Sequence, residues 1–338
     1  MAKFADVLTI VNGKNQKKVE NPHGKYPVYG SGGIMGYADD YICEAETVVL
    51  GRKGSINNPI FVETPFWNVD TAFGLHAECS KLFPKYLYYF CVNYDFERLN
   101  TTVTIPSLTK ANLLNVEIPL PPLEEQRRIA ALLDRVSDLI AKRRAQLDKL
   151  DLLVKARFVE MFGDPVKNDK GLPTMMGQNF FKLSNGKFVP ENKRLDSGIP
   201  AYGGNGVSWC TDEILCKENT IVVGRVGFQS GNVHFVKGPL WITDNAMYIS
   251  NYNTRKYDLF FLYVLMEHID FTRFQDAGDL KKITQKPFMS MEYIMPTLSR
   301  QREYVAFAKQ INKSKLTLQQ SLDKLETLKK ALMQQYFG

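Results

Sequence analysis

The chain has 338 residues, of which 44% are hydrophobic, and a formal net charge of +7; this length is enough for two or three globular domains. It contains no run of about 18 apolar residues, so no membrane-spanning helix is predicted, and the opening MAKFADVLTI lacks the features of a secretory signal. The five cysteines show no C-x-x-C spacing and the four histidines are isolated, which argues against a disulfide framework or a metal site. We therefore expect a cytoplasmic protein that binds no metal.

The positive charge is unevenly distributed along the chain. The net charge is −1 over residues 1–122, +2 over residues 123–163, +1 over residues 164–297 and +5 over residues 298–338. A basic total is typical of proteins that bind nucleic acid. Here most of the surplus lies in the last segment, where the solvated face of a helix explains it equally well. Charge alone therefore does not identify a partner.

Residues 1–122 have the composition of a domain built from short strands. Glycine, proline and aromatic residues are frequent, and β-branched runs such as residues 47–50 and 60–62 are separated by turn residues. A helix is predicted over residues 85–99, which read KYLYYFCVNYDFERL. This pattern favours an α+β domain with a strongly bent sheet.

Residues 123–163 predict one long helix. Apolar residues recur there mostly every three or four positions, and the segment has no internal glycine or proline. Pro121 and Pro122 end any element that precedes it. Gly163, followed by Pro165, ends the helix.

The same pattern then repeats. Residues 164–297 carry β-branched runs at 220–223 and 233–236 and a predicted helix at 257–269, and residues 298–338 predict a second long helix. Because the two helices match in length and each has a long, narrow apolar seam, we expect them to form an antiparallel coiled-coil pair that separates two similar domains. The alternative is that each helix packs on its own domain.

Short motifs recur in the same order in both halves. Tyr-Gly at residues 29–30 returns at residues 202–203, and Gly-Arg-x-Gly at residues 51–54 returns at residues 224–227. A duplicated chain presents two similar surfaces. Such a pair of surfaces suits a partner with two-fold symmetry, for example duplex DNA.

The motifs that would indicate catalysis are incomplete. Residues 30–36 nearly match the dinucleotide-binding G-x-G-x-x-G, but Met35 occupies the last glycine position and no helix follows. Residues 58–61 (NPIF) resemble the N-P-P-F box of DNA adenine methyltransferases, but Ile60 replaces the second proline and no cofactor-binding half is visible. No convincing nucleophile arrangement is present. The sequence therefore indicates a binding protein and not an enzyme.

The two ends of each long helix resemble those of a known family. Residues 118–126 read IPLPPLEEQ, and the first helix ends with MFGDP at residues 161–165. The second copy keeps a single proline, Pro296, together with Gln301, and ends with YFG at residues 336–338. In this order and in two copies, these motifs strongly resemble the DNA-specificity subunits of type I restriction-modification systems. The resemblance covers essentially the whole chain.

This resemblance implies a division of labour. Residues 1–122 and 164–297 would be target-recognition domains, each reading one half of a split sequence in double-stranded DNA. Residues 123–163 and 298–338 would be spacer helices that set the length of the unread gap. The subunit would recruit two adenine methyltransferase subunits, which would bind the S-adenosylmethionine, and a motor-nuclease subunit would join in some systems. The chain itself would hold no cofactor and catalyse nothing.

Side-chain chemistry indicates which residues of the chain would contact DNA. Arginine reads guanine, asparagine and glutamine read adenine, and lysine binds phosphates. The candidate DNA contacts are Arg52, Lys53, Ser55, Asn57, Asn58, Thr101, Thr102, Arg225, Gln229, Ser230, Asn232, Lys281 and Lys282. The residues expected to fit the two helices to each other and, by resemblance, to the partner subunits are Gln126, Arg127, Ile129, Gln301, Arg302, Leu322 and Leu325. The alternative for the loops is that their glycines only shape a tight turn and that the polar tips are solvated.

The sequence leaves two other functions open. A two-domain scaffold would bind protein or carbohydrate through the sheet-rich domains, and the aromatic residues Trp209 and Phe228 are its best support. A complete methyltransferase would require a cofactor motif that the sequence lacks. The polar tips of the two loops, which differ although their glycine frame is shared, favour the DNA-reading function.

Overall fold

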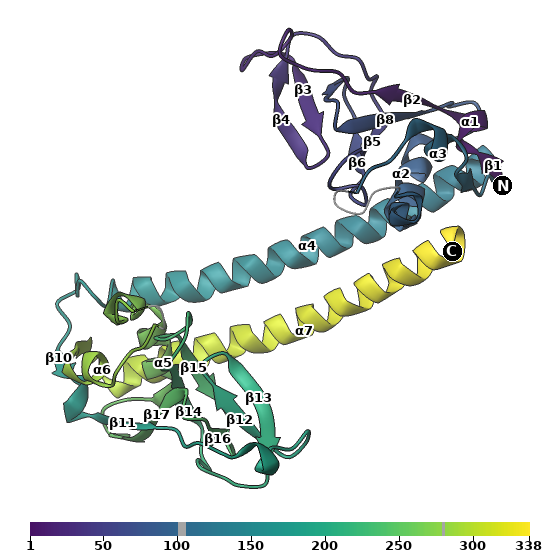
Figure 1. The fold of residues 1–338 in the computed structure, drawn as a ribbon. Coiled ribbons are helices and arrows are strands. Elements are labelled where there is room, and N and C mark those ends of the chain that lie inside the picture. Colours follow the sequence, from purple (N-terminus) through teal and green to yellow (C-terminus); the bar gives the residue numbers. More distant parts are fainter. Residues whose placement is uncertain (101–105, 279–280) are drawn as a thin grey trace. The chain divides into compact units, whose positions relative to one another are not determined.

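The computed structural model describes residues 1–100, 106–278 and 281–338, and the chain divides into two compact units (Figure 1). Unit 1 comprises Met1–Gln146 and Leu318–Gly338, and unit 2 comprises Leu147–Thr317. Each unit therefore contains one sheet-rich domain and part of both long helices. No helix of the described residues is long and apolar enough to cross a membrane.

The strands of unit 1 build a four-stranded sheet beside smaller ones. Their bounds are Ala2–Lys3 (β1), Leu8–Asn12 (β2), Tyr26–Gly30 (β3), Gly33–Ala38 (β4), Thr47–Gly51 (β5), Ile60–Val62 (β6), Trp67–Asn68 (β7), Ala72–Ala77 (β8) and Glu117–Ile118 (β9). The described strands pair in the orders β2-β8-β5-β6, β4-β3-β7 and β1-β9. The β-branched run in β5 is buried along its whole length because β8 and β6 flank it on either side.

Unit 2 repeats this arrangement strand for strand. The bounds are Thr174–Met176 (β10), Phe181–Asn185 (β11), Ile199–Gly203 (β12), Gly206–Thr211 (β13), Thr220–Gly224 (β14), Val233–Val236 (β15), Trp241–Ile242 (β16), Ala246–Tyr252 (β17) and Glu292–Ile294 (β18). The orders are β11-β17-β14-β15, β13-β12-β16 and β10-β18. Even the register shift in β3, between Val28 and Tyr29, returns in β12 between Ala201 and Tyr202. The predicted α+β class and the duplication are confirmed.

One helix packs on the four-stranded sheet of each domain. The short helices are α1 (Phe4–Val7), α2 (Pro84–Asn93), α3 (Lys110–Leu114), α5 (Leu259–Glu267) and α6 (Lys286–Ser290), with 3-10 turns η1 (Phe96–Leu99), η2 (Gly177–Asn179), η3 (Glu191–Lys193) and η4 (Thr272–Phe274). Helix α2 is shorter than predicted, because Asp95 is extended and its side chain accepts from Glu97 N–H to begin η1. In unit 1, Leu87 and Phe90 of α2 share a buried cluster with Leu75 of β8.

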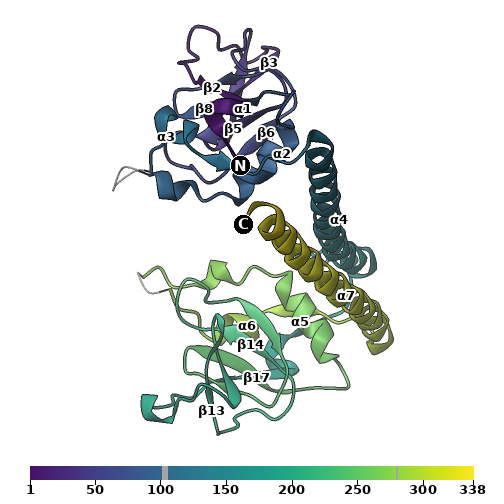
Figure 2. The ribbon, with the colours of Figure 1, turned by 90° about the vertical axis from the view of Figure 1, so that its right-hand side faces the viewer.

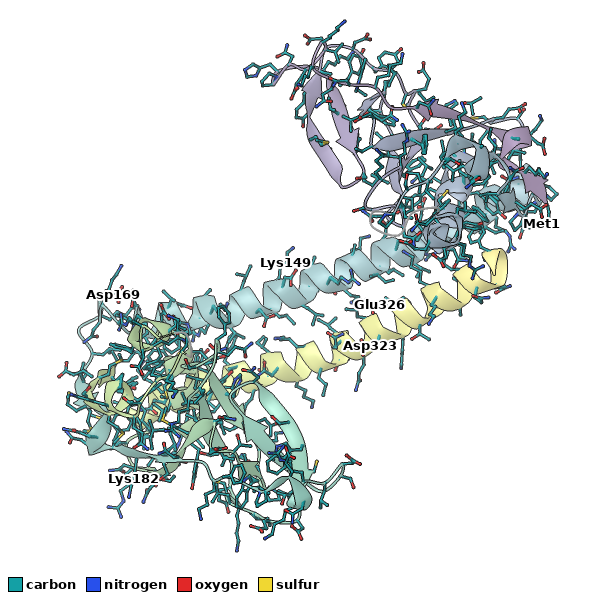
Figure 3. All side chains as sticks on the ribbon, in the orientation of Figure 1. Met1, Lys149, Asp169, Lys182, Asp323 and Glu326 are labelled. Atoms are coloured by element: carbon teal, nitrogen blue, oxygen red, sulfur yellow. The ribbon has the colours of Figure 1, made fainter. Side chains whose placement is uncertain are left out.

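The two long helices are α4 (Leu123–Phe162) and α7 (Leu298–Phe337) (Figures 1 and 2). In unit 1, the beginning of α4 lies beside the end of α7, since Ile129 and Met333 belong to one buried cluster. Farther along, Arg144 pairs with Glu326, labelled in Figure 3, at 2.6 Å. In unit 2, the end of α4 lies beside the beginning of α7, where Arg157 pairs with Glu303 at 3.1 Å.

The predicted antiparallel pairing is therefore confirmed within each unit. The alternative packing is present as well, because each helix also contacts a sheet-rich domain. Phe158 of α4, for example, is fully buried and stacks on His268 with ring centroids 4.1 Å apart. Lys85 of α2 donates to Asp134 of α4 at 3.0 Å, and this hydrogen bond raises the pKa of the Lys85 ammonium. Tyr89 donates to the same carboxylate at 2.7 Å.

The larger sheets of each domain meet at a matching junction. In unit 1, Trp67 Nε1 donates to Lys14 O at 2.9 Å, and Lys14 N–H donates to Asn68 O at 2.9 Å. In unit 2, Trp241 Nε1 donates to Lys187 O at 3.0 Å, and Lys187 N–H donates to Ile242 O at 2.9 Å. The same hydrogen bonds thus hold the two sheets together in both copies.

Candidate nucleic-acid interface

The loops that follow β5 and β14 have the same backbone frame. Each begins with the Gly-Arg-x-Gly motif, and the last glycine of the motif has a positive φ, +81° at Gly54 and +95° at Gly227. A side chain rarely adopts this conformation, which explains why glycine recurs there. The frame therefore turns the chain in the same way in both domains.

The segment before each long helix braces the loop. In unit 1, Gly54 N–H donates to Pro106 O at 3.1 Å, and Leu108 N–H donates to Arg52 O at 2.9 Å. In unit 2, Gly227 N–H donates to Lys281 O at 2.8 Å, and Ile283 N–H donates to Arg225 O at 2.9 Å. In unit 2, Lys281 and Lys282, which are far from the loop in the sequence, thus lie beside it; in unit 1 the described residues Pro106 and Leu108 occupy the matching place.

The candidate contacts of unit 1 are placed in different ways. Lys53, Ser55 and Asn58 are exposed on the loop. Arg52 is half-buried, with its guanidinium 5.7 Å from the centre of the Phe73 ring. Thr101 and Thr102 lie outside the described residues.

Asn57 has a role within the domain. Its Nδ2 donates to Asp95 Oδ1 at 3.1 Å, and its Oδ1 accepts from Phe96 N–H at 2.7 Å. Both ends of the amide therefore hold the beginning of η1, which gives the exposed Asn57 a structural role, and its contact with DNA stays a prediction.

In unit 2, Gln229, Asn232 and Lys282 are exposed and Lys281 is half-buried. Arg225 Nη1 donates to Asp244 O at 3.1 Å, which holds its guanidinium against the domain. Ser230 is the exception among these loop residues. This serine is fully buried, so it cannot reach a base edge, and that candidate is corrected.

A cavity of about 390 Å³ opens beside the unit 2 loop, and its lining includes Ser208, Trp209 and Thr243. Arg194 stacks on Trp209, with the guanidinium 5.3 Å from the ring centre. Within the described residues, no group of three or more His, Cys, Asp or Glu could hold a metal ion. The polar lining and the exposed loop tips together suit a ligand rich in hydrogen-bonding groups.

Comparison with known proteins agrees with this geometry. Residues 1–150 match the family model described as the type I restriction modification DNA specificity domain. A putative type I restriction enzyme specificity subunit of Haemophilus influenzae is 29% identical over 143 residues, which cover 40% of this chain and 37% of the relative. The putative MjaX specificity subunit of Methanocaldococcus jannaschii is 22% identical over 292 residues, which cover 77% of this chain and 68% of the relative.

The fold agrees as well. The solved S subunit of a type I restriction-modification system from M. genitalium has a TM-score of 0.74 at 17% identity, and the match covers 100% of this chain and 95% of that one. The chain is thus similar to specificity subunits of type I restriction-modification systems, in sequence over residues 1–150 and in fold over its whole length.

The structure gives the two repeated glutamines of this chain a role that the sequence did not reveal. Gln126 and Gln301 are fully buried. Gln126 Oε1 accepts from Phe83 N–H at 2.8 Å, and its Nε2 donates to Lys81 O at 2.9 Å and Pro121 O at 2.8 Å. Gln126 and Gln301 therefore fasten the two long helices to units 1 and 2, and their buried side chains are not available to a partner subunit.

Gln301 makes the equivalent set of bonds in unit 2. Its Oε1 accepts from Asp258 N–H at 2.9 Å, and its Nε2 donates to Lys256 O and Pro296 O, both at 2.8 Å. The remaining helix candidates differ in exposure: Arg127 and Arg302 are exposed, Leu325 is half-buried, and Ile129 and Leu322 are buried.

Proposed function

We propose that this specificity subunit binds double-stranded DNA and reads a two-part target, with one half-site for each sheet-rich domain. The observation that carries the proposal is the pair of matching loops, which share their frame and bracing but differ at their tips. Lys53, Ser55 and Asn58 are exposed in the first loop, and Gln229 and Asn232 in the second. Different polar tips on one frame are what two readers of unlike half-sites require.

The experiment that tests this proposal exchanges one domain. Residues 164–297 are replaced by the matching segment of a relative with a different target, and methylated adenines are mapped by single-molecule sequencing in a host that carries the methyltransferase. We expect one half of the methylated motif to change and the other half to remain. A change in both halves would contradict the assignment of one half-site to each domain.

The proposal includes two adenine methyltransferase subunits as partners, with S-adenosylmethionine bound to them, and a motor-nuclease subunit in a restriction-competent complex. The specificity subunit itself would be non-catalytic, and the two long helices would set the length of the unread gap. An exposed stripe on α4 supports the recruitment. Five exposed residues follow one face of α4 at alternating spacings of four and three: Arg128, Leu132, Arg135, Leu139 and Lys142. This spacing is the one at which residues of a helix contact a partner helix.

Leu132→Glu and Leu139→Glu should each weaken recruitment of the methyltransferase about 10-fold or more. Each substitution removes an apolar contact with the partner and introduces an unpaired charge in its place. Co-purification and a titration with the methyltransferase measure the effect. Val92→Glu is the matched control, since Val92 is an exposed apolar residue that belongs to α2 and not to a long helix. Equal recruitment by all variants would exclude this stripe as the docking surface.

The isolated subunit should bind DNA weakly. Residues 1–122 and 164–297 have net charges of only −1 and +1, and neutralisation of phosphates supplies much of the affinity of DNA-binding proteins. Tight binding is therefore expected only when the methyltransferase subunits complete the complex. Fluorescence anisotropy at physiological salt, with and without these partners, measures the difference; nanomolar binding by the subunit alone would contradict the prediction.

A further inference from the structure

One aromatic side chain of unit 2 extends into solvent. Phe228 is 92% exposed, the highest value among the exposed large apolar side chains of the described residues. It follows Gly227 at the tip of the loop after β14. A single exposed ring is ordinary on a protein surface. Three further features favour a partner for Phe228: the hydrogen-bonded turn that carries it, the neighbouring cationic residues, and the absence of an aromatic residue from the first copy of the loop.

The turn that carries Phe228 is rigidly held. Ser230 N–H donates to Gly227 O at 3.0 Å and closes the turn. Gln275 Nε2 donates to Ser230 O at 2.6 Å and to Phe228 O at 3.5 Å. Because this backbone is already ordered, contact between the ring and a partner costs little conformational entropy.

Cationic residues lie next to the turn. Arg225 precedes it in the loop, and Lys281 and Lys282 belong to the segment that pairs with it through the Val226–Lys282 bridge. Phosphates attract such cations. Proteins that insert an apolar side chain between base pairs combine the two features, because cations hold the backbone on either side of the inserted ring.

The first copy of the loop shows that the frame does not require an aromatic residue. Ser55 follows Gly54 there, as Phe228 follows Gly227 in the second copy. The Gly54 N–H is bound to Pro106 O as the Gly227 N–H is bound to Lys281 O. After these glycines the turns close differently, since Ile56 N–H donates to Gly54 O at 2.9 Å and Ser230 N–H donates to Gly227 O at 3.0 Å. The braced glycine is compatible with serine as the next residue, so the ring of Phe228 is a feature of unit 2 alone.

We infer that Phe228 is a wedge that enters the base stack of the half-site bound by unit 2 and unstacks one base step. This inference rests on the proposed function, because only a DNA-reading loop meets a base stack. Pyrimidine–purine steps unstack most readily, so we expect such a step where the ring enters. The wedge thereby adds a sequence preference that needs no hydrogen bond to a base.

The test uses the full-length subunit with its methyltransferase partners and a duplex target selected from a random pool. 2-Aminopurine, which brightens when it is unstacked, replaces each purine of the two half-sites in turn. With the wild-type chain we expect a several-fold increase at one position of one half-site. Phe228→Ala should abolish that increase and weaken binding about 5- to 100-fold, whereas Phe228→Trp should retain both.

Ile214→Ala is the matched control, because Ile214 is another exposed large apolar residue of unit 2, and it should leave the fluorescence of the unit 2 half-site unchanged. Because Phe228 is exposed, its replacement should not alter the Tm. A target that is bound but gives the same fluorescence with wild type and Phe228→Ala would overturn the inference and leave the proposed function intact. Failure of the pool to yield any target would overturn the proposed function, and this inference with it.

Discussion

Replacing Gln126 with alanine is expected to lower the free energy of unfolding of unit 1 by about 2–4 kcal/mol. The side chain is fully buried, and its amide bonds to three main-chain groups, those of Lys81, Phe83 and Pro121. Alanine would leave these groups without their partner and would open a cavity between α2 and α4. Gln301→Ala should have an effect of similar size on unit 2, because it makes the equivalent bonds.

Calorimetry of the full chain measures both effects. Gln126→Ala should lower the Tm of the transition that belongs to unit 1, and Gln301→Ala that of unit 2, by several degrees. Gln320→Ala is the matched control, since Gln320 is exposed on α7, and it should change the stability by less than about 0.5 kcal/mol. A buried glutamine variant as stable as this control would show that the hydrogen bonds contribute little.

The long helices could be predicted from the sequence almost to the residue. The prediction was residues 123–163 and 298–338, and the helices span Leu123–Phe162 and Leu298–Phe337. Proline before the first helix and glycine after it mark its ends, and an apolar period of three to four residues persists between them. These are local signals, so a single sequence contains them in full.

The roles of individual polar side chains could not be predicted in the same way. Gln126 binds Lys81 and Phe83, and Asn57 binds Asp95 and Phe96. Their partners are mostly main-chain groups some forty residues away, and any residue type supplies such groups. A buried amide of this kind and an exposed one that reads a base have the same sequence signature.

Replacing Gly13 or Gly186 with alanine should cost about 3 kcal/mol or more. Both glycines lie at the junction between the sheets, directly before Lys14 and Lys187. A Cβ on Gly13 would overlap the carbonyl oxygen of Val69, and one on Gly186 would overlap that of Thr243. Because main-chain atoms cannot rotate away as a side chain can, the junction itself must shift.

The junction borders the loops, because Arg52 N–H donates to Thr71 O at 2.8 Å and Arg225 N–H donates to Asn245 O at 2.9 Å. Its distortion is therefore expected to affect DNA binding. Each variant should unfold its own unit at a lower temperature and, where it still folds, bind the corresponding half-site more weakly. Gly32→Ala is the matched control, because a Cβ there has no neighbouring atom within 4 Å. Calorimetry and titration with the target measure the two effects. If Gly13→Ala were as stable as Gly32→Ala, close approach of the chain at the junction would not be the reason that glycine recurs there in both copies.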